Sequence, residues 1–234
     1  MKAAVIVFPG SNCDRDLAIA LEMVGFEVSK IWHKNSHLEK NIDLVAIPGG
    51  FSFGDYLRVG AIAASSPICK SIISHGERGG YILGVCNGFQ ILTETGLLPG
   101  ALLRNNGLKY ICKTIDLKVE TSDSIFTNRY NRSNVIKLPI AHHDGNYNAN
   151  MKDIDRMKDQ GLIAFRYCEN PNGSIDDIAG ILSPNKRVLG MMPHPERAAE
   201  QAHGNVDGVR FFKGLADIVL SLIHISEPTR PYWI

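Results

Sequence analysis

The stretch Gly80-Tyr81-Ile82-Leu83-Gly84-Val85-Cys86-Asn87-Gly88-Phe89-Gln90-Ile91-Leu92 decides the fold, because one element ends and another begins inside it with no turn between them. The apolar run 81–85 is typical of a buried strand, and after Cys86 the apolar residues recur at helical spacing. Cys86 therefore stands at a sharp strand-to-helix corner, with Gly84 and Gly88 two residues away on either side.

This corner has the form of a nucleophile elbow, with cysteine in place of serine. The two glycines relieve crowding around the sharp turn. We expect the Cys86 thiol to face outward at the carboxyl end of the strand, where the N-terminus of the next helix favours the thiolate. The alternative is a buried, inert cysteine, which is the common state of a free thiol. The paired glycines favour the nucleophile.

The N-terminal half predicts a parallel sheet. Residues 3–8, 27–32 and 43–47 have the composition of strands, and a helix capped by Ser11 or Asn12 is expected between the first two, ending at Gly25. Strand, helix and strand in this order are typical of a right-handed βαβ unit. Another helix is expected to begin at Ser66-Pro67, just before the cysteine corner.

The C-terminal half predicts shorter elements and completes a single α/β domain. Residues 111–120 alternate imperfectly and predict an antiparallel edge strand, and 178–182 with 188–192 predict a hairpin. The other expected elements are strands at 135–141 and 162–167 and helices at 151–158 and 206–222. We expect residues 1–222 to form the domain and residues 223–234, which show no periodicity, to be a disordered or non-native tail.

Composition excludes several classes of partner. The 234 residues carry a net charge of +1 with no long basic run, so neither nucleic acid nor a membrane surface is expected as a partner. No apolar stretch approaches the length of a membrane span or of a signal-peptide core. The five cysteines are odd in number and widely spaced, which predicts reduced thiols in a cytoplasmic protein.

His194 has the setting of a catalytic base. It follows an apolar strand, lies between Pro193 and Pro195, and has Glu196 two residues on. The prolines bias His194 toward an extended conformation, in which residues i and i+2 project to the same side. We therefore expect Glu196 to orient the imidazole. The alternative is a solvated histidine–glutamate pair in a surface turn.

The adjacent residues His142 and His143 are competing bases, of which at most one can face a given site. No second cluster with ligand spacing accompanies them, so no metal site is expected. Two backbone N–H groups are expected to form an oxyanion hole. One belongs to Gly50, in a glycine-rich turn after a strand end, and the other to Asn87, directly after the cysteine. No phosphate loop or dinucleotide fingerprint is present, so no cofactor site is expected in this chain.

Three motif blocks together resemble the class I (triad) glutamine amidotransferases. In chain order they are Pro48-Gly49-Gly50, Gly84-Val85-Cys86-Asn87-Gly88-Phe89-Gln90 and Pro193-His194-Pro195-Glu196. The extended block from Pro48 to Arg58 and the Asn-Gly-Phe-Gln run after the cysteine are most similar to the branch that serves de novo purine synthesis. One departure is His143, which stands where a small residue is expected.

The resemblance implies a flavodoxin-like fold, with a mostly parallel sheet flanked by helices and a small antiparallel extension. It also implies that Cys86 attacks the side-chain amide of L-glutamine, with His194 and Glu196 completing the triad and backbone N–H groups near Gly50 and Asn87 holding the oxyanion. The residues that it places at the substrate are Gln90, Phe51 and His142.

Partners also follow from the resemblance. Ammonia is expected to pass to a large synthetase subunit that binds ATP, magnesium and formylglycinamide ribonucleotide, with a small third subunit bridging the two. The alternatives are a subunit for another acceptor or a lone glutaminase, a catalytically silent binding module, and a triad peptidase or DJ-1-like hydrolase. The intact Cys86, His194 and Glu196 disfavour a silent module, and the Pro-His-Pro-Glu setting of the base disfavours a peptidase.

Overall fold

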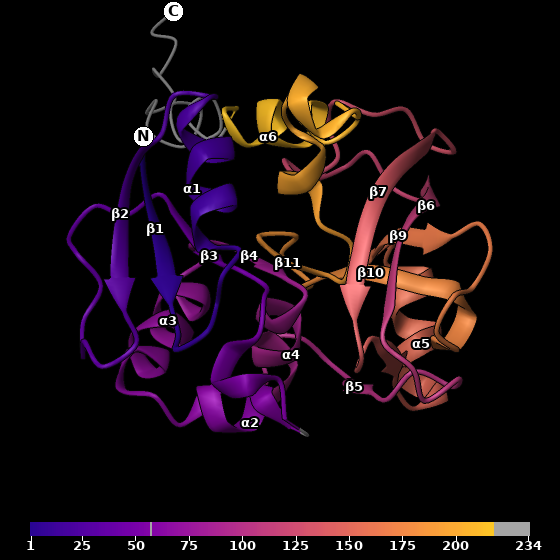
Figure 1. The fold of residues 1–234 in the computed structure, drawn as a ribbon, viewed down its shortest axis with the longest axis horizontal. Coiled ribbons are helices and arrows are strands. Elements are labelled where there is room, and N and C mark those ends of the chain that lie inside the picture. Colours follow the sequence, from indigo (N-terminus) through magenta and orange to yellow (C-terminus); the bar gives the residue numbers. More distant parts are fainter. Residues whose placement is uncertain (57, 218–234) are drawn as a thin grey trace, which may run out of the picture.

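The strands of the chain form one large sheet in which a parallel half continues into an antiparallel half (Figure 1). The computed structural model describes residues 1–56 and 58–217. The strand order is β2-β1-β3-β4-β11-β10-β9-β6-β7. The bounds are β1 Lys2–Val7, β2 Glu27–Trp32, β3 Leu44–Ile47, β4 Tyr81–Val85, β6 Ile111–Val119, β7 Val135–His142, β9 Ile163–Tyr167, β10 Ile178–Leu182 and β11 Val188–Met191.

Strands β2, β1, β3, β4 and β11 pair in parallel, as the βαβ pattern predicts. From β11 the sheet continues antiparallel through β10, β9, β6 and β7. The α/β prediction is confirmed, and the antiparallel extension has four strands. A separate antiparallel pair is formed by β5 (Ala101–Leu103) and β8 (Asn146–Asn148).

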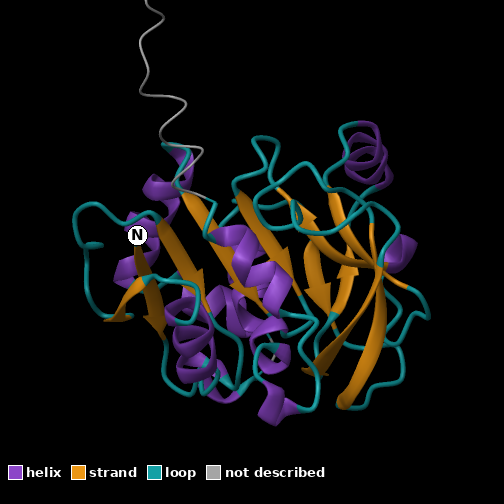
Figure 2. Cartoon of the chain, turned by 90° about the horizontal axis from the view of Figure 1, so that it is seen from above, coloured by secondary structure: helices purple, strands orange, loops and turns teal. Residues whose placement is uncertain are grey.

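Helices lie on both sides of the sheet (Figure 2). Their bounds are α1 Asp14–Glu22, α2 Val59–Ala64, α3 Pro67–Glu77, α4 Asn87–Glu94, α5 Met151–Asp159 and α6 Val209–Leu215. Of these, α2 was not expected from the sequence. Short 3₁₀ turns, η1 to η4, span Ser52–Gly54, Ile175–Asp177, Pro195–Ala198 and Gln201–His203. No helix of the described residues is long and apolar enough to span a membrane.

Two expectations were wrong, one about the cap of a helix and one about the position of a strand in the sheet. Helix α1 begins after Cys13, so neither Ser11 nor Asn12 caps it; the Ser11 hydroxyl instead donates to the Phe8 carbonyl at 2.9 Å and closes the turn after β1. Strand β6 is not an edge strand, because it pairs with β7 on one side and β9 on the other. The edge strand on the antiparallel side of the sheet is β7, and the other edge strand is β2. The expected tail at 223–234 lies outside the described residues.

The parallel half of the sheet brings the three motif blocks together at the carboxyl ends of its strands. Strands β3, β4 and β11 are neighbours and run in the same direction, with every residue buried. Their carboxyl ends lead into Pro48, Cys86 and the segment that contains His194. In an open parallel sheet, ligands bind just beyond the carboxyl ends of the strands.

Candidate active site

The strand-to-helix corner at Cys86 has the predicted nucleophile-elbow geometry. Cys86 lies between the end of β4 at Val85 and the start of α4 at Asn87, with φ 53° and ψ −107°, a conformation that L residues rarely adopt. A Cβ at Gly84 would lie 2.7 Å from the Gly88 carbonyl oxygen, and a Cβ at Gly88 would collide with the carbonyl oxygen of Ile47. Both glycines are therefore required by close backbone approach, as expected.

The expectation that the Cys86 thiol faces outward as a thiolate was wrong. The residue is 2% exposed, and the thiol donates to the Ala141 carbonyl oxygen at 3.7 Å. Burial, the largest influence, raises the pKa of Cys86, with nearby Cys13 adding to it; the Asn87 backbone N–H lowers it by less. The sulfur is therefore a protonated thiol at rest and needs a base.

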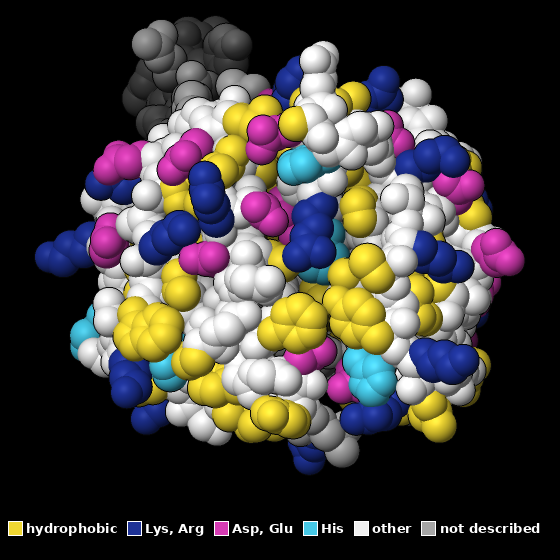
Figure 3. Space-filling model, in the orientation of Figure 1, with side chains coloured by type: hydrophobic (Ala, Val, Ile, Leu, Met, Phe, Trp, Pro, Cys, Tyr) yellow, Lys and Arg dark blue, Asp and Glu magenta, His cyan; other side chains and the backbone are white. Residues whose placement is uncertain are grey.

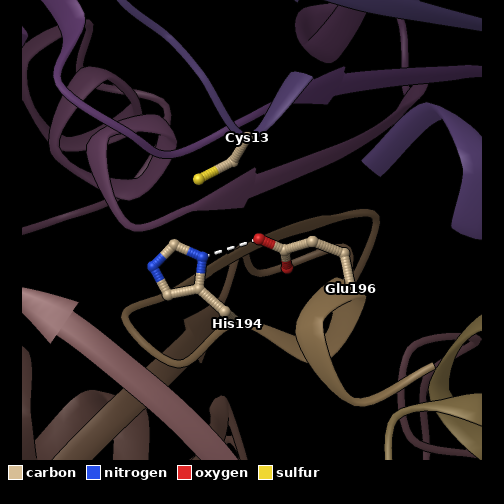
Figure 4. Close-up of side chains that lie close together, drawn as sticks. All are labelled: Cys13, His194 and Glu196. Carbon is tan, nitrogen blue, oxygen red and sulfur yellow. Dashed lines mark hydrogen bonds and ion pairs between the residues drawn. The ribbon is translucent and has the colours of Figure 1, made fainter. Parts of the chain in front are cut away.

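His194 and Glu196 form the predicted pair. The His194 Nδ1 and Glu196 Oε1 atoms are 2.6 Å apart, and both residues are 1% exposed (Figure 4). Because a carboxylate only accepts, Nδ1 carries a proton, which in the neutral tautomer leaves the lone pair on Nε2. The backbone differs from the extended segment expected, since Glu196 lies in the 3₁₀ turn η3. His194 itself donates its backbone N–H to Pro139 of β7 at 2.8 Å.

Gly49 lies where the side chains of Cys86 and His194 come together. A Cβ built on Gly49 would lie 2.8 Å from Cys86 Cβ and also 2.8 Å from His194 Cε1. The two side chains therefore share the space in front of this glycine, which no other residue type leaves free. His194 Nε2 is buried and has no hydrogen-bond partner among the described residues, as a waiting proton acceptor requires.

The backbone around Gly50 and Asn87 suits an oxyanion hole. Gly50 has φ +123°, and a Cβ there would meet the Asn12 backbone nitrogen at 2.6 Å. The Asn87 side chain accepts from the Ser52 N–H at 3.0 Å and so ties the glycine-rich loop to the elbow. Among the hydrogen bonds of residues 1–56 and 58–217, none involves the backbone N–H of Gly50, and the backbone N–H of Asn87 hydrogen-bonds to the Cys86 thiol.

Two of the three expected substrate residues lie near this corner. Gln90 donates from Nε2 to the Asp144 carbonyl at 2.8 Å and accepts from the Asn87 side chain at 2.9 Å, so both ends of its amide are engaged within the protein. Phe51 is 47% exposed and stacks on Tyr110 with ring centroids 6.1 Å apart. Tyr110 was not expected from the sequence.

His142, the third, is buried, and Asn105 determines its tautomer. Asn105 donates from Nδ2 to the carbonyls of Lys109 and His142, so its Oδ1 accepts from His142 Nδ1, at 3.1 Å. Burial and the neighbouring His194 lower the pKa of His142 to about 4. His142 is therefore a neutral imidazole with an accepting Nε2. Its neighbour His143 is partly exposed and lies 3.8 Å from an oxygen of Asp144.

Sequence reasoning missed Cys13. This residue precedes α1, is fully buried, and points its sulfur toward His194 and Glu196 (Figure 4). The sulfur, a His194 ring nitrogen and a Glu196 carboxylate oxygen all lie within 4.8 Å of one another. The Arg197 guanidinium donates from Nη2 to the Cys13 sulfur at 2.8 Å. Burial, followed by the charge of Glu196, raises the pKa of Cys13 to about 12, so its thiol is protonated.

The face in Figure 3 shows hydrophobic side chains at its centre, with basic groups above them and acidic and histidine groups below. Large hydrophobic side chains are exposed at several positions along the chain, and those near the site are Phe51 and Tyr110, both about half exposed. Exposed apolar groups rimmed by charge are typical of an interaction surface.

Comparison with known proteins agrees with this geometry. The family model of the CobB/CobQ-like glutamine amidotransferase domain matches residues 1–210. Phosphoribosylformylglycinamidine synthase subunit PurQ of Ruegeria sp. (strain TM1040) is 68% identical, over 94% of this chain and 99% of the relative. The same subunit of Ruegeria pomeroyi is 68% identical, over 92% of this chain and 97% of the relative.

Among solved structures, a chain of PurLQS from Thermotoga maritima matches with a TM-score of 0.84 and 44% identity, covering 94% of this chain and 98% of that one. The chain therefore belongs to the CobB/CobQ-like glutamine amidotransferase family, in the branch formed by the PurQ subunits of phosphoribosylformylglycinamidine synthase.

Proposed function

We propose that this chain is the glutaminase subunit of phosphoribosylformylglycinamidine synthase. It hydrolyses L-glutamine through a cysteine thioester and delivers ammonia for the conversion of formylglycinamide ribonucleotide to formylglycinamidine ribonucleotide. The observation that carries the chemistry is the space in front of Gly49, where Cys86 and His194 converge with Glu196 behind the imidazole. The relatives carry the assignment to purine synthesis.

The first half of the reaction forms the thioester. His194 Nε2 takes the proton of the Cys86 thiol, and the sulfur attacks the side-chain carbonyl carbon of glutamine. The backbone N–H groups of Gly50 and Asn87 stabilise the oxyanion. Glu196 stabilises the imidazolium, which then gives its proton to the departing nitrogen; the C–N bond breaks and ammonia leaves.

The second half hydrolyses the thioester. His194 Nε2 takes a proton from water, the resulting hydroxide attacks the acyl carbon, and the C–S bond breaks to release glutamate. The sulfur regains the proton from the imidazolium. No cofactor of this chain is needed, because nucleophile, base and orienting carboxylate are all side chains.

Three residues are proposed to form the glutamine pocket. His142 offers an accepting Nε2 close to His194, and Phe51 forms an aromatic wall with Tyr110. Gln90 acts by holding the pocket together, since its amide joins Asn87 to the backbone of Asp144. This arrangement gives the pocket one apolar wall and one polar wall.

The partners are proposed to be a large synthetase subunit, which binds ATP and magnesium, and a small bridging subunit. The solved relative is a chain of the PurLQS structure from Thermotoga maritima, which supports such an assembly. We place the enzyme in the cytoplasm, and its five unpaired cysteines are compatible with a reducing compartment.

Glutamine hydrolysis, measured for this chain alone and with a candidate synthetase, formylglycinamide ribonucleotide and ATP, tests the assignment. We expect weak activity alone and strong activation in the mixture. An unchanged rate on adding the partner and its substrates contradicts the role in purine synthesis.

The variant Cys86→Ala tests the nucleophile in the same mixture. Glutamine-dependent product should disappear, whereas added ammonium chloride should still support synthesis, because the partner keeps its own active site. Product formation from glutamine by the variant removes Cys86 from its proposed role.

A further inference from the structure

We propose that Cys13, His194 and Glu196 form a binding site for a thiophilic divalent cation, Zn²⁺ in particular, whose occupation switches the glutaminase off. Their ligand atoms lie within 4.8 Å of one another, and all three residues are at most 1% exposed. A thiolate, an imidazole and a carboxylate are the donor types that zinc takes in proteins.

The polar atoms of this cluster are incompletely partnered. Glu196 Oε2 is buried and has no hydrogen bond from any described residue, although buried carboxylate oxygens are normally satisfied. Ligand atoms around a tetrahedral zinc lie about 3.3–3.7 Å apart. A cation therefore requires the 2.6 Å contact between His194 Nδ1 and Glu196 Oε1 to open and the Cys13 sulfur to move inward. Both movements require rotation of the Cys13 and Glu196 side chains.

Arg197 supports the sulfur ligand. Its Nη2 already donates to Cys13 Sγ at 2.8 Å, and a hydrogen bond to a metal-bound thiolate is the usual support from the second layer of a metal site. The charges also balance, because the thiolate and the carboxylate together neutralise a divalent ion.

A cation bound at this site blocks catalysis because it changes which ring nitrogen of His194 carries the proton. In the free enzyme, the Nδ1 proton bonds to Glu196 and Nε2 accepts the Cys86 proton. A cation takes the Nδ1 lone pair, so the single ring proton moves to Nε2 and the imidazole can no longer act as a base. One proton is released to solvent, from the Cys13 thiol. The inhibitory effect rests on the proposed function, whereas the binding does not.

Cobalt binding tests the site directly, because a thiolate bound to Co²⁺ gives a near-ultraviolet charge-transfer band. The full chain is used with the exposed Cys112 and Cys168 changed to serine, so that surface thiols do not contribute. We expect the band to saturate at one equivalent of Co²⁺, to disappear when Zn²⁺ is added, to persist in Cys86→Ala and to be lost in Cys13→Ala. A band that survives Cys13→Ala but not Cys86→Ala places the metal on the nucleophile and overturns the proposal, as does the absence of any band.

Inhibition is measured as glutamine hydrolysis with and without Zn²⁺. With each protein compared to its own zinc-free rate, the Cys13→Ala variant should need at least tenfold more Zn²⁺ for half-inhibition than the parent, and EDTA should restore the parent. Equal sensitivity of the two proteins contradicts the switch. If Cys13→Ala does not fold, Cys13→Ser replaces it, because serine can still accept from Arg197 but is a poor zinc ligand. A cobalt band in a chain that hydrolyses no glutamine even with the synthetase, formylglycinamide ribonucleotide and ATP refutes the proposed function and leaves the metal site standing.

Discussion

Gly49 shows how much of this site depends on one missing side chain. Its position faces both Cys86 Cβ and His194 Cε1, each 2.8 Å from where its Cβ would be. In sequence terms Gly49 belongs to an ordinary Pro-Gly-Gly turn. In the structure, glycine is the only residue type at this position that lets Cys86 and His194, the proposed nucleophile and base, approach each other.

The variant Gly49→Ala should therefore lose activity without losing its fold. The added methyl pushes the nucleophile and base apart, and a displacement of about 1 Å in an active site costs roughly 10²-fold in rate. Steady-state glutaminase kinetics should show the loss in kcat. Gly107→Ala is the matched control, because a Cβ there meets nothing within 4 Å. Equal rates for the two variants contradict this placement of Gly49.

Glu196 is expected to act through the tautomer of His194. In Glu196→Gln the shape is kept, but the amide cannot stabilise an imidazolium and can donate to Nδ1, which puts the ring proton on the wrong nitrogen. The loss in kcat should be about 10³–10⁴-fold, as for an orienting carboxylate in other triads. Synthesis from added ammonia with the partner subunit should be unaffected. A loss below tenfold would mean that Glu196 is only structural.

At the scale of elements, the elbow and its neighbouring loops form one hydrogen-bonded unit. The Asn87 side chain, in the first turn of α4, holds Ser52 at 3.0 Å and Gln90 at 2.9 Å, and Gln90 in turn holds Asp144. The loops that follow β3 and β7 are thus tied to the start of α4. This explains how segments more than fifty residues apart reach a common geometry.

Helix α5 offers a test of stability away from the site. Asn150 caps it by accepting from the Asp153 N–H at 2.9 Å. Asn150→Ala should lower the free energy of unfolding by about 1 kcal/mol, which for a chain of this size lowers Tm by about 2–4 °C. Asn150→Ser, which keeps a capping oxygen, should recover most of the loss. Because α5 lies outside the catalytic segments, glutaminase activity at 25 °C should be unchanged; a change in kcat would contradict that separation.

At the scale of the whole molecule, burial determines which groups carry charge. His142 lies inside the protein, where burial and His194 lower its pKa to about 4, whereas the unfolded chain protonates it near the ordinary value of about 6.5. Between these two values the unfolded state binds the extra proton. Stability is therefore lost as pH falls from about 6.5 to about 4, and none of this effect remains above about pH 7.

Urea unfolding at pH 7 and pH 5 measures this coupling. The His142 contribution should cost the wild type about 2 kcal/mol over that interval. His142→Gln cannot take up the proton, so its loss of stability should be smaller by that amount, with the other histidines acting equally in both proteins. Parallel losses in the two proteins would show that His142 titrates normally in the folded state.

Most of the elements follow from local pattern. The strands β1 to β4, the helix begun by Ser66-Pro67 and the hairpin of β10 and β11 were predicted within one or two residues, because side-chain period, proline and glycine act over short distances. Helix α2 was missed, since Val59–Ala64 is too short to show a period. The sequence analysis also predicts β6, and not β7, as an edge strand. Strand order cannot be read from local pattern, because it depends on pairing between distant segments.

For the site, short motifs in the sequence predict the three proposed triad residues, the elbow glycines and the family, since the spacing within these motifs reports backbone geometry. Packing between distant segments determines that Cys86 is buried as a thiol, that Asn105 sets the tautomer of His142, and that Cys13 lies against His194 and Glu196. Burial and pKa depend on everything packed around a group, and Cys13 is separated from His194 by most of the chain. No local pattern records such a contact.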